Sequence, residues 1–351
     1  MRKEKRQVRV GNIKIGGNSP VVVQSMTKTK TADIKRTVQQ IKRLERAGCE
    51  VVRLAVRDRT EARALKEIKQ KVGVPLVADI HFDYRLALLA IDSGIDKIRI
   101  NPGNIGGPER IQEVIKKAKD YCIPIRIGIN AGSLPEEILK KYSHPTPEAM
   151  IETLNRTLEV FYKNSFYDIV ISAKCASVVD TLRVYEMIHN LCDFPLHLGI
   201  TEAGLLLPGA IHSAVGIGIL LSQGIGDTIR VSLTADPVKE VIAGFEILSS
   251  LNLRTTGPKL VSCPTCGRCE VNLKKIAHRV EQKIKNLKKP LTIAVMGCVV
   301  NGPGEAKEAD FGIACGKGIG AIFAKGREIK RVKESKLVEE LWEVIDENTG
   351  D

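Results

Sequence analysis

Four cysteines in the last third of the chain have the spacing of metal ligands. Cys263, Cys266 and Cys269 recur at every third position, and Cys298 follows a short apolar run. Thiolates are soft ligands that favour zinc or an iron–sulfur cluster over harder metal ions. The pattern therefore predicts a metal site and leaves the choice between these two metals open.

The arrangement of the thiols bears on that choice. A zinc ribbon usually pairs two Cys-x-x-Cys knuckles, whereas here the distal Cys298 is followed by no other cysteine before Cys315. Radical-type iron–sulfur enzymes usually carry a Cys-x3-Cys-x2-Cys run, which this sequence lacks. From spacing alone, we expect Cys263, Cys266, Cys269 and Cys298 to hold a 4Fe–4S cluster, with zinc as the alternative.

A second group of chemically active side chains consists of arginines inside apolar runs. The triplet Ile-Arg-Ile or Ile-Arg-Val surrounds Arg99, Arg126 and Arg230. An arginine in an apolar strand is costly unless it is paired, and a guanidinium binds phosphate in a bidentate manner. We therefore expect these arginines to bind phosphate groups. The alternative is that they form internal ion pairs with Asp79 and Glu202.

Other polar side chains lie in or just after the same runs. Candidate substrate contacts, besides the three arginines, are Arg53, Asn101, Asn130, Lys174, His197 and Ser232. Candidates for acid–base chemistry are Asp79, His81, His197 and Glu202, of which we favour the two carboxylates. A loop containing Gly103, Gly106 and Gly107 precedes a predicted helix and is a candidate phosphate-binding loop.

The elements that must position these groups follow a regular repeat. Eight short apolar, β-branched runs occupy residues 21–26, 51–56, 75–80, 97–100, 124–129, 168–173, 195–200 and 228–233. Segments with helical periodicity separate most of them. This alternation predicts an α/β fold, a (β/α)8 TIM barrel with its chemistry at the carboxyl ends of the strands. A doubly wound open sheet is the alternative.

Further elements surround the repeat. Residues 7–20 predict a hairpin that turns at Gly11 and Asn12, and residues 134–142 predict an extra helix after the fifth strand. Beyond the barrel we expect helices at 271–287 and 335–348, and strands at 291–296, 311–314 and 321–324. The sequence thus predicts a barrel domain, 1–256, and a small α+β metal-binding domain, 257–351.

Composition restricts the function classes. The chain has 351 residues, a net charge of +13 and only 4% aromatic residues. The charge suits either nucleic acid or a small anionic substrate, but few aromatics argue against a single-strand stacking surface.

No apolar run approaches the length of a membrane helix, and no signal core follows the basic N-terminus. We expect a cytoplasmic protein without membrane or nucleic-acid partners; a zinc-containing nucleic-acid-binding protein is the competing class.

Two segments resemble the signatures of a known enzyme family. Residues 262–268, Ser-Cys-Pro-Thr-Cys-Gly-Arg, and 296–305, Met-Gly-Cys-Val-Val-Asn-Gly-Pro-Gly-Glu, resemble the 4-hydroxy-3-methylbut-2-enyl diphosphate synthase family in its bacterial two-domain form. Residues 22–27, 99–104, 126–134, 197–204 and 227–234 match the family as well. The resemblance implies a TIM barrel followed by a sulfite/nitrite reductase-like iron–sulfur domain.

The resemblance also implies an activity. Members of this family open the ring of 2-C-methyl-D-erythritol 2,4-cyclodiphosphate and remove a hydroxyl group in the non-mevalonate isoprenoid pathway. Two electrons pass from ferredoxin or flavodoxin through a 4Fe–4S cluster. The family further implies a head-to-tail homodimer, in which the cluster domain of one subunit caps the barrel of the other.

The family implies a ligand set that differs from the one expected from spacing. Carried over to this sequence, the cluster ligands are Cys263, Cys266, Cys298 and Glu305, and Cys269 is not a ligand. A carboxylate binds a soft cluster more weakly than a thiolate, so its iron can exchange it for a substrate oxygen. The catalytic residues expected on this basis are Glu202, Asp79 and Glu305.

Overall fold

The computed structural model describes residues 5–201, 204–255, 257–284, 287 and 289–349. The chain divides into two compact units, Met1–Arg254 and Thr255–Asp351. Each unit has its own hydrophobic core. One predicted catalytic residue, Glu202, lies outside the described residues.

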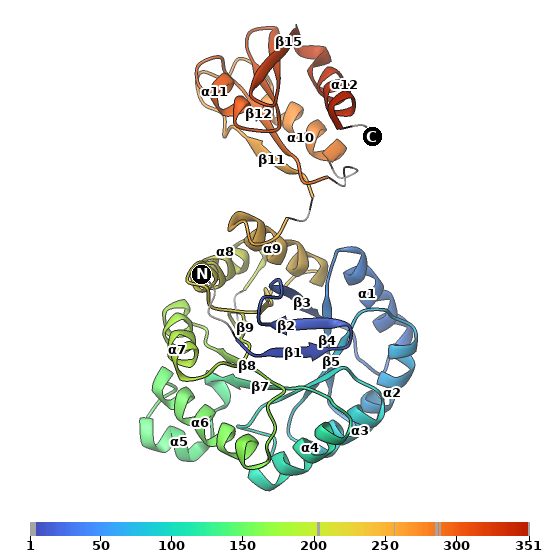
Figure 1. Ribbon diagram of the computed structural model, residues 1–351, viewed down its shortest axis with the longest axis vertical. Helices are drawn as coiled ribbons and strands as arrows, with labels where there is room; N and C mark the ends of the chain where they lie inside the picture. Colours follow the sequence, from blue (N-terminus) through green and yellow to red (C-terminus); the bar gives the residue numbers. More distant parts are fainter. Residues whose placement is uncertain (1–4, 202–203, 256, 285–286, 288, 350–351) are drawn as a thin grey trace. The chain divides into compact units, whose positions relative to one another are not determined.

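The first unit contains a parallel barrel (Figure 1). Its strands are β3 (Val22–Met26), β4 (Val51–Val56), β5 (Leu76–Ile80), β6 (Lys97–Ile100), β7 (Ile125–Asn130), β8 (Ile169–Lys174), β9 (His197–Leu198) and β10 (Thr228–Ile229). They pair in the order β8-β7-β6-β5-β4-β3-β10-β9, and a bridge between Ile171 and Leu196 brings β8 to the segment before β9. The prediction of an eight-stranded TIM barrel, rather than an open sheet, is confirmed.

The last two barrel strands are shorter than predicted. Beyond Leu198 and Ile229 the chain leaves the regular ladder. At the end of the run predicted for β10, a side chain takes the place of a strand partner: the backbone amide of Leu233 donates to Oε1 of Glu240 at 3.1 Å. A hydrophobic pattern does not reveal a side chain that takes the place of a strand partner. The apolar run predicted six strand residues, and the structure has two.

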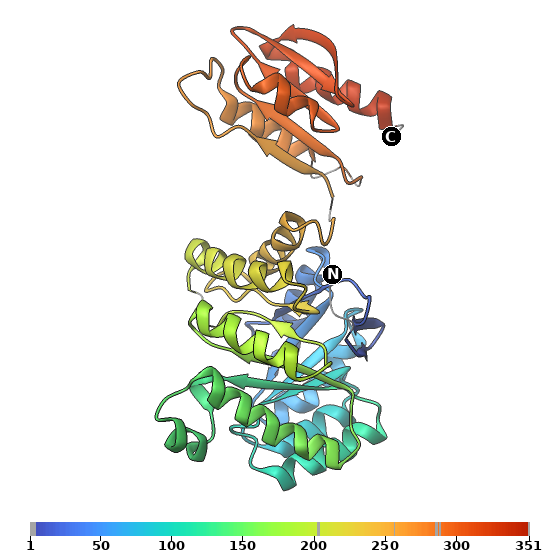
Figure 2. The same ribbon diagram turned by 60° about the vertical axis from the view of Figure 1, so that its left-hand side comes forward.

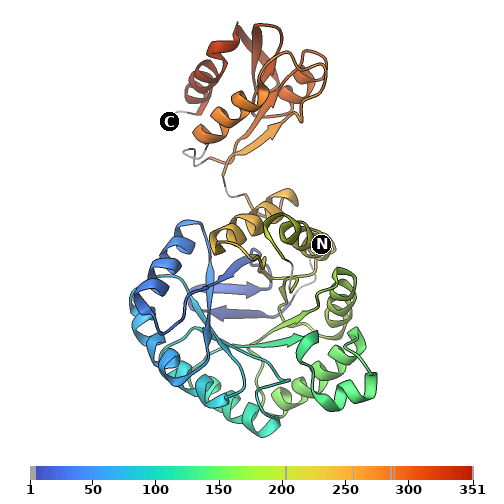
Figure 3. The same ribbon diagram turned by 180° about the vertical axis from the view of Figure 1, so that it is seen from behind.

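Helices surround the strands, as Figure 3 shows from the other side. They are α1 (Ile34–Arg46), α2 (Arg59–Gln70), α3 (Tyr84–Asp92), α4 (Pro108–Asp120), α5 (Glu136–Tyr142), α6 (Pro147–Lys163), α7 (Val178–Leu191), α8 (Leu206–Ser222) and α9 (Pro237–Ser250). The predicted extra helix after the fifth strand is α5. Helix α1 illustrates the local rules: Asp33 caps its first turn, and Val38, Ile41 and Leu44 are buried on one face.

A hairpin closes the amino-terminal end of the barrel. Strands β1 (Gln7–Val10) and β2 (Ile13–Gly16) pair as predicted around Gly11, whose φ of 57° suits glycine. Side chains from the hairpin pack with those at the starts of three barrel strands, in a cluster of Val10, Ile15, Val22, Val51 and Val77. With this end filled by apolar side chains, polar groups inside the barrel lie toward the other end.

The second unit is an α+β domain with a mixed sheet (Figure 2). The sheet order is β11 (Lys259–Ser262), β12 (Thr292–Met296), β13 (Phe311–Cys315), β14 (Ile319–Ala324) and β15 (Arg327–Lys333). Strands β11 to β13 are parallel, and β14 and β15 are antiparallel. The helices are α10 (Leu273–Ile284), α11 (Gly302–Lys307) and α12 (Leu337–Thr349).

No helix within the described ranges is long and apolar enough to cross a membrane. Helix α8 is the most apolar by composition, and it has 17 residues. A bilayer-spanning helix needs about 20.

Candidate active site and metal centre

Asp79 holds two arginines inside the barrel. Its Oδ1 accepts a hydrogen bond from Nη1 of Arg99 at 3.1 Å, and its Oδ2 lies 3.6 Å from Nε of Arg53. Burial by itself raises the pKa of Asp79, but the positive charges of Arg53 and Arg99 hold that pKa well below its usual range. Asp79 is therefore ionised at neutral pH. For Arg99, the internal ion pair given as the alternative is present, and Arg53 shares the same carboxylate.

His81 connects this cluster to the loop after β6. Nη1 of Arg99 lies 2.6 Å from Nε2 of His81, and Nδ2 of Asn104 lies 3.0 Å from Nδ1. Because an arginine can only donate, Nε2 must accept, and Nδ1 then carries the proton. Oδ1 of Asn104 has no partner among the described residues. When the side-chain amide of Asn104 is rotated by 180°, its Oδ1 accepts a hydrogen bond from Nδ1 of His81. Both atoms then have a hydrogen-bond partner.

Arg126 and Lys174 lack such compensation. Within the part of the chain that the structure describes, Nε and Nη1 of Arg126 have no hydrogen-bond partner. Burial, followed by repulsion from Arg53 and Arg99, lowers the pKa of Arg126 well below its usual value. Burial and repulsion from Arg53 and Arg126 do the same to Lys174. These groups form a desolvated cationic site that an anion would stabilise.

Arg230 has a partner that the sequence did not predict. Its Nη2 lies 3.3 Å from Oε2 of Glu240, a fully buried carboxylate on α9. Glu240 also accepts from Ser25 Oγ at 3.0 Å and pairs with Lys28 at 3.2 Å. Burial, followed by repulsion from Arg53, still lowers the pKa of Arg230. Nε of Arg230 has no partner in the described ranges, so this guanidinium retains a free donor.

Two more basic groups lie inside the barrel. His197 is fully buried; its Nδ1 is 3.4 Å from Thr228 Oγ1, and its Nε2 has no partner among the residues described. Burial, then the charge of Arg126, lowers the pKa of His197 well below 6.5, so it is neutral. Lys97 is fully buried as well, and sequence reasoning missed it. The signal was present, because Lys-Ile-Arg-Ile places Lys97 on the same strand face as Arg99.

The remaining predicted substrate contacts differ in how far their side chains are already bound within the protein. Asn101 is engaged within the protein: its Nδ2 donates to Ser133 Oγ at 2.8 Å, and its Oδ1 accepts from the Gly103 amide at 3.0 Å. It therefore shapes the loop after β6. Asn130 ends β7 and Ser232 follows β10, and both side chains are half-buried.

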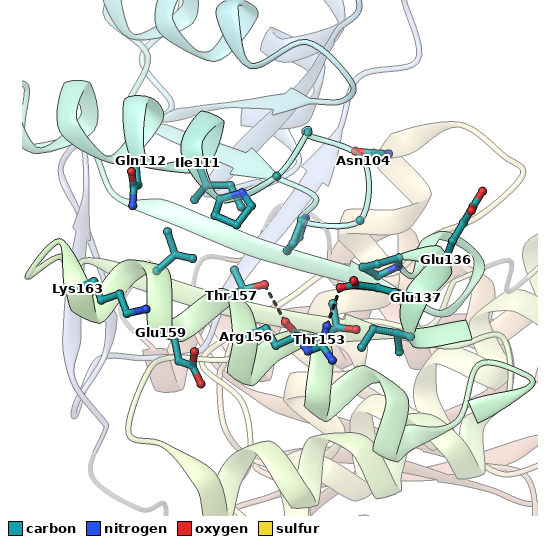
Figure 4. A pocket seen from close by; sticks show the side chains of 18 residues that line it. Asn104, Ile111, Gln112, Glu136, Glu137, Thr153, Arg156, Thr157, Glu159 and Lys163 are labelled. Atoms are coloured by element: carbon teal, nitrogen blue, oxygen red, sulfur yellow. Dashed lines mark hydrogen bonds and ion pairs between the residues drawn. The ribbon is translucent and has the colours of Figure 1, made fainter. Parts of the chain in front are cut away.

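The glycine loop predicted to bind phosphate lines a separate cavity of about 620 Å³ (Figure 4). This cavity lies between the loop after β6 and helices α4, α5 and α6. One of its two cations, Arg156, is already paired with Glu137 at 2.6 Å and with Glu152 at 2.7 Å. Phosphate binding by this loop stays a prediction.

The predicted cluster ligands come from neighbouring segments of the second unit. Cys263 follows β11, and its amide donates to the Val295 carbonyl oxygen of β12 at 3.1 Å. Cys298 follows β12, and Glu305 lies on α11. Because β11 and β12 are parallel neighbours, the segments after them leave the sheet at the same edge. Cys266 is exposed, Cys263 is half-buried and Cys298 is buried.

The local environments of the cysteines differ. Hydrogen bonds from the backbone amides of Asn301 and Val300 are the largest causes that lower the pKa of Cys298, and a lowered pKa favours the thiolate that binds metals. The thiol of Cys269 instead donates to the Val271 carbonyl oxygen at 3.3 Å. A Cβ at position 297 would lie 2.7 Å from this sulfur, so Gly297 leaves the room that Cys269 occupies.

No three His, Cys, Asp or Glu side chains of the described residues lie close enough together to hold a metal ion. The ligand set therefore stays a prediction. The chemistry of the donors nevertheless fits an iron–sulfur cluster, since Cys263, Cys266 and Cys298 are all free thiols and backbone hydrogen bonds lower the pKa of Cys298.

Two domain families match this chain. The GcpE TIM-barrel domain matches residues 5–245, and the GcpE protein C-terminal domain matches residues 259–347. Among similar solved structures, dihydropteroate synthase from Stenotrophomonas maltophilia has 13% identity and a TM-score of 0.51, covering 70% of this chain and 98% of that one. Spore coat polysaccharide biosynthesis protein spsE from Bacillus subtilis has 12% identity and a TM-score of 0.51, covering 70% and 73%. These likenesses show the barrel fold alone.

Curated relatives match over nearly the full length. The chain is 57% identical to the 4-hydroxy-3-methylbut-2-en-1-yl diphosphate synthase (flavodoxin) of Caldanaerobacter subterraneus subsp. tengcongensis, covering 99% of this chain and 98% of the relative. It is 54% identical to the protein of the same name from Thermodesulfovibrio yellowstonii, covering 98% and 99%. Domain order, coverage and identity agree, and the chain therefore belongs to the GcpE family.

Proposed function

We propose that this chain converts 2-C-methyl-D-erythritol 2,4-cyclodiphosphate to 4-hydroxy-3-methylbut-2-enyl diphosphate. The reaction consumes two electrons and two protons, opens the ring at a carbon–oxygen bond and releases one oxygen as water. The observation that carries the proposal is the 57% identity over 99% of the chain to a relative named for this product. The test is conversion of the cyclic diphosphate by anaerobically purified protein.

The barrel is the site we assign to the cyclic diphosphate. Arg126 and Lys174 are buried basic groups whose pKa values burial and nearby arginines lower, and Nε of Arg230 faces no partner among the described residues. A doubly charged anion between such groups replaces lost solvation with charge-assisted hydrogen bonds. The same arrangement argues against nucleic acid as the ligand, because these cations are inside the barrel and not on its surface.

Asp79 has a structural role in this proposal. Its pKa lies well below the usual range, so it does not hold a proton at neutral pH and cannot donate one to a leaving oxygen. It orients Arg53 and Arg99, which in turn positions His81. Glu202, expected at the carboxyl end of the seventh strand, remains our candidate for the proton donor.

The second unit would hold the cofactor. We propose that Cys263, Cys266, Cys298 and Glu305 bind a 4Fe–4S cluster. When bound, such a cluster supplies electrons one at a time and a Lewis-acidic iron. The chain contributes the thiolate of Cys298, which backbone amides stabilise, and an exposed carboxylate on α11. The hydrogen-bonded thiol of Cys269 supports its exclusion from the ligand set.

Of the two predicted electron donors, we propose flavodoxin. The curated relatives carry the word flavodoxin in their names. The net charge of +13 suits a donor protein with an acidic surface, because opposite charges speed encounter between partners.

We also propose that the chain forms a homodimer. Four apolar residues recur at every fourth position on α8 and are exposed: Leu207, Ile211, Val215 and Ile219, with exposed fractions from 70% to 39%. The helix has no Asp, Glu, Lys or Arg. An uncharged stripe of this kind is self-complementary, as a twofold interface requires, and it offers nothing to attract a charged electron donor.

A further inference from the structure

Lys97 is a buried lysine that the proposed chemistry does not use. It lies on β6 two residues before Arg99, so both side chains point into the barrel. The exposed fraction of Lys97 is 0%, and its Nζ has no hydrogen-bond partner within the described ranges. Lysine is almost never fully buried without a partner, so this amine requires a physical reason.

The charges that act on Lys97 are positive. Burial, followed by repulsion from Arg126 on β7 and Arg53 on β4, lowers its pKa to about 7. Lys97 in turn lowers the pKa of His197 on β9. Above neutral pH, the amine is therefore mostly uncharged.

The neighbouring strand β5 has no acidic residue opposite Lys97. In the register between β5 and β6, Val77 lies opposite Lys97, whereas Asp79 lies opposite Arg99. Asp79 is already shared between Arg99 and Arg53. Lys97 thus lies one layer deeper than the ion pair, level with Val77 of the apolar plug, whereas Arg126 lies opposite Arg99.

We propose that Lys97 is a positioning residue of the anion site: its amine is neutral while the barrel holds no anion, and it takes a proton from solvent when a diphosphate group binds at Arg126. The inference rests on the proposed function, because that function places a diphosphate in the barrel. The physical reason is that anion binding and proton binding at this site favour each other. A nearby anion favours the ammonium form, so proton uptake strengthens anion binding by the same free energy.

The alternative proton acceptor is His197. Its pKa lies well below 6.5, so an anion must shift it much further than Lys97 before it takes up a proton at pH 8. The substrate does not exchange protons there, because each phosphorus of a cyclic diphosphate carries only one, strongly acidic, hydroxyl group. Lys174 is a further buried amine whose pKa burial and repulsion from Arg53 lower, so the part of the proton uptake at pH 8 that Lys97→Met abolishes reports on Lys97.

The experiment is isothermal titration calorimetry of the cluster-loaded chain with the cyclic diphosphate at pH 8. No reductant is added, and buffers of different ionisation enthalpy reveal how many protons are taken up. The wild type and Lys66→Met, an exposed control on α2, are expected to take up about one proton per substrate bound. Lys97→Met is expected to take up almost none and to bind more weakly at pH 7.

A second variant covers the case in which Lys97→Met does not fold. Lys97→Arg carries a permanent charge, so its affinity is expected to be independent of pH. The wild-type affinity is expected to fall by about tenfold per pH unit above pH 7. Unchanged proton uptake in Lys97→Met, or a wild-type affinity that does not vary with pH, overturns the inference. A wild type that binds no cyclic diphosphate contradicts the proposed function instead.

Discussion

The residues inside the barrel fall into two electrostatic classes. Arg53 and Arg99 are compensated by Asp79, whereas the buried nitrogens of Arg126 face no partner in the described part of the chain. Removing one partner of a buried ion pair destabilises a fold because it leaves a buried charge unpaired, whereas an uncompensated buried cation already opposes folding. The second class is therefore retained for the ligand and not for stability.

This distinction predicts opposite effects of two similar substitutions. Arg126→Met removes a desolvated cation, so we expect an unchanged or higher free energy of unfolding, and a Michaelis constant raised by about ten- to a hundredfold through lost charged hydrogen bonds. Arg99→Met leaves Asp79 with one arginine fewer and should cost about 3–5 kcal/mol of stability. Anaerobic urea unfolding and steady-state kinetics measure both. Equal destabilisation by the two variants would contradict the assignment.

Lys97 predicts a pH dependence of stability without ligand. Its folded pKa of about 7 lies below its unfolded value of about 10.4, so between these values the unfolded chain binds more protons. Stability contributed by this group therefore rises with pH, by up to about 1.4 kcal/mol per unit. Lys97→Met should flatten the unfolding free energy between pH 7 and 10, measured against Lys66→Met. Identical slopes in the two variants would reject the low pKa.

At the scale of elements, Glu305 tests the metal centre. It lies on α11, separate from the cysteine-bearing segments. We expect Glu305→Ala to keep part of its cluster, because three thiolates remain, and to lose turnover. Iron and sulfide analysis together with kinetics measure the two effects, and Glu308→Ala, an exposed neighbour just after α11, is the control. Full turnover by Glu305→Ala would remove the carboxylate from the mechanism.

Most barrel elements could be predicted because each strand is a buried β-branched run, and a cap such as Asp33 starts the following helix. Strand β11 was missed because it has only four residues and most of them are exposed, and β15 was missed because its side chains are largely exposed and charged. Helix α11 was missed because it has six residues and begins Gly-Pro-Gly, which favours a turn.

The candidate site could be predicted only in part. Periodicity placed Arg99 and Arg126 inside the barrel, but their different partners depend on contacts between strands. Glu240 was missed because it belongs to the helix after the last strand, where a charged residue usually faces solvent. Asn104 was missed because its role depends on meeting His81, 23 residues away in sequence.

At the scale of the whole molecule, the apolar stripe on α8 predicts the oligomeric state. Val215→Lys places a charge within the stripe, so we expect light scattering to detect a monomer where the wild type is a dimer. Gln70→Lys, an exposed change on α2, should remain dimeric. Since the family resemblance implies that one subunit caps the other's barrel, turnover should fall with the dimer. A dimeric Val215→Lys would place the interface elsewhere.

The proposed reaction needs both the cationic barrel and the domain that carries the thiolates. The most direct test is a single-turnover experiment: anaerobically purified chain, with iron and sulfide quantified, is reduced and mixed with 2-C-methyl-D-erythritol 2,4-cyclodiphosphate. The account predicts labile sulfide, an electron paramagnetic resonance signal of a 4Fe–4S cluster, and formation of 4-hydroxy-3-methylbut-2-enyl diphosphate. Stoichiometric zinc without sulfide, or a reduced cluster that leaves the substrate unchanged, would contradict it.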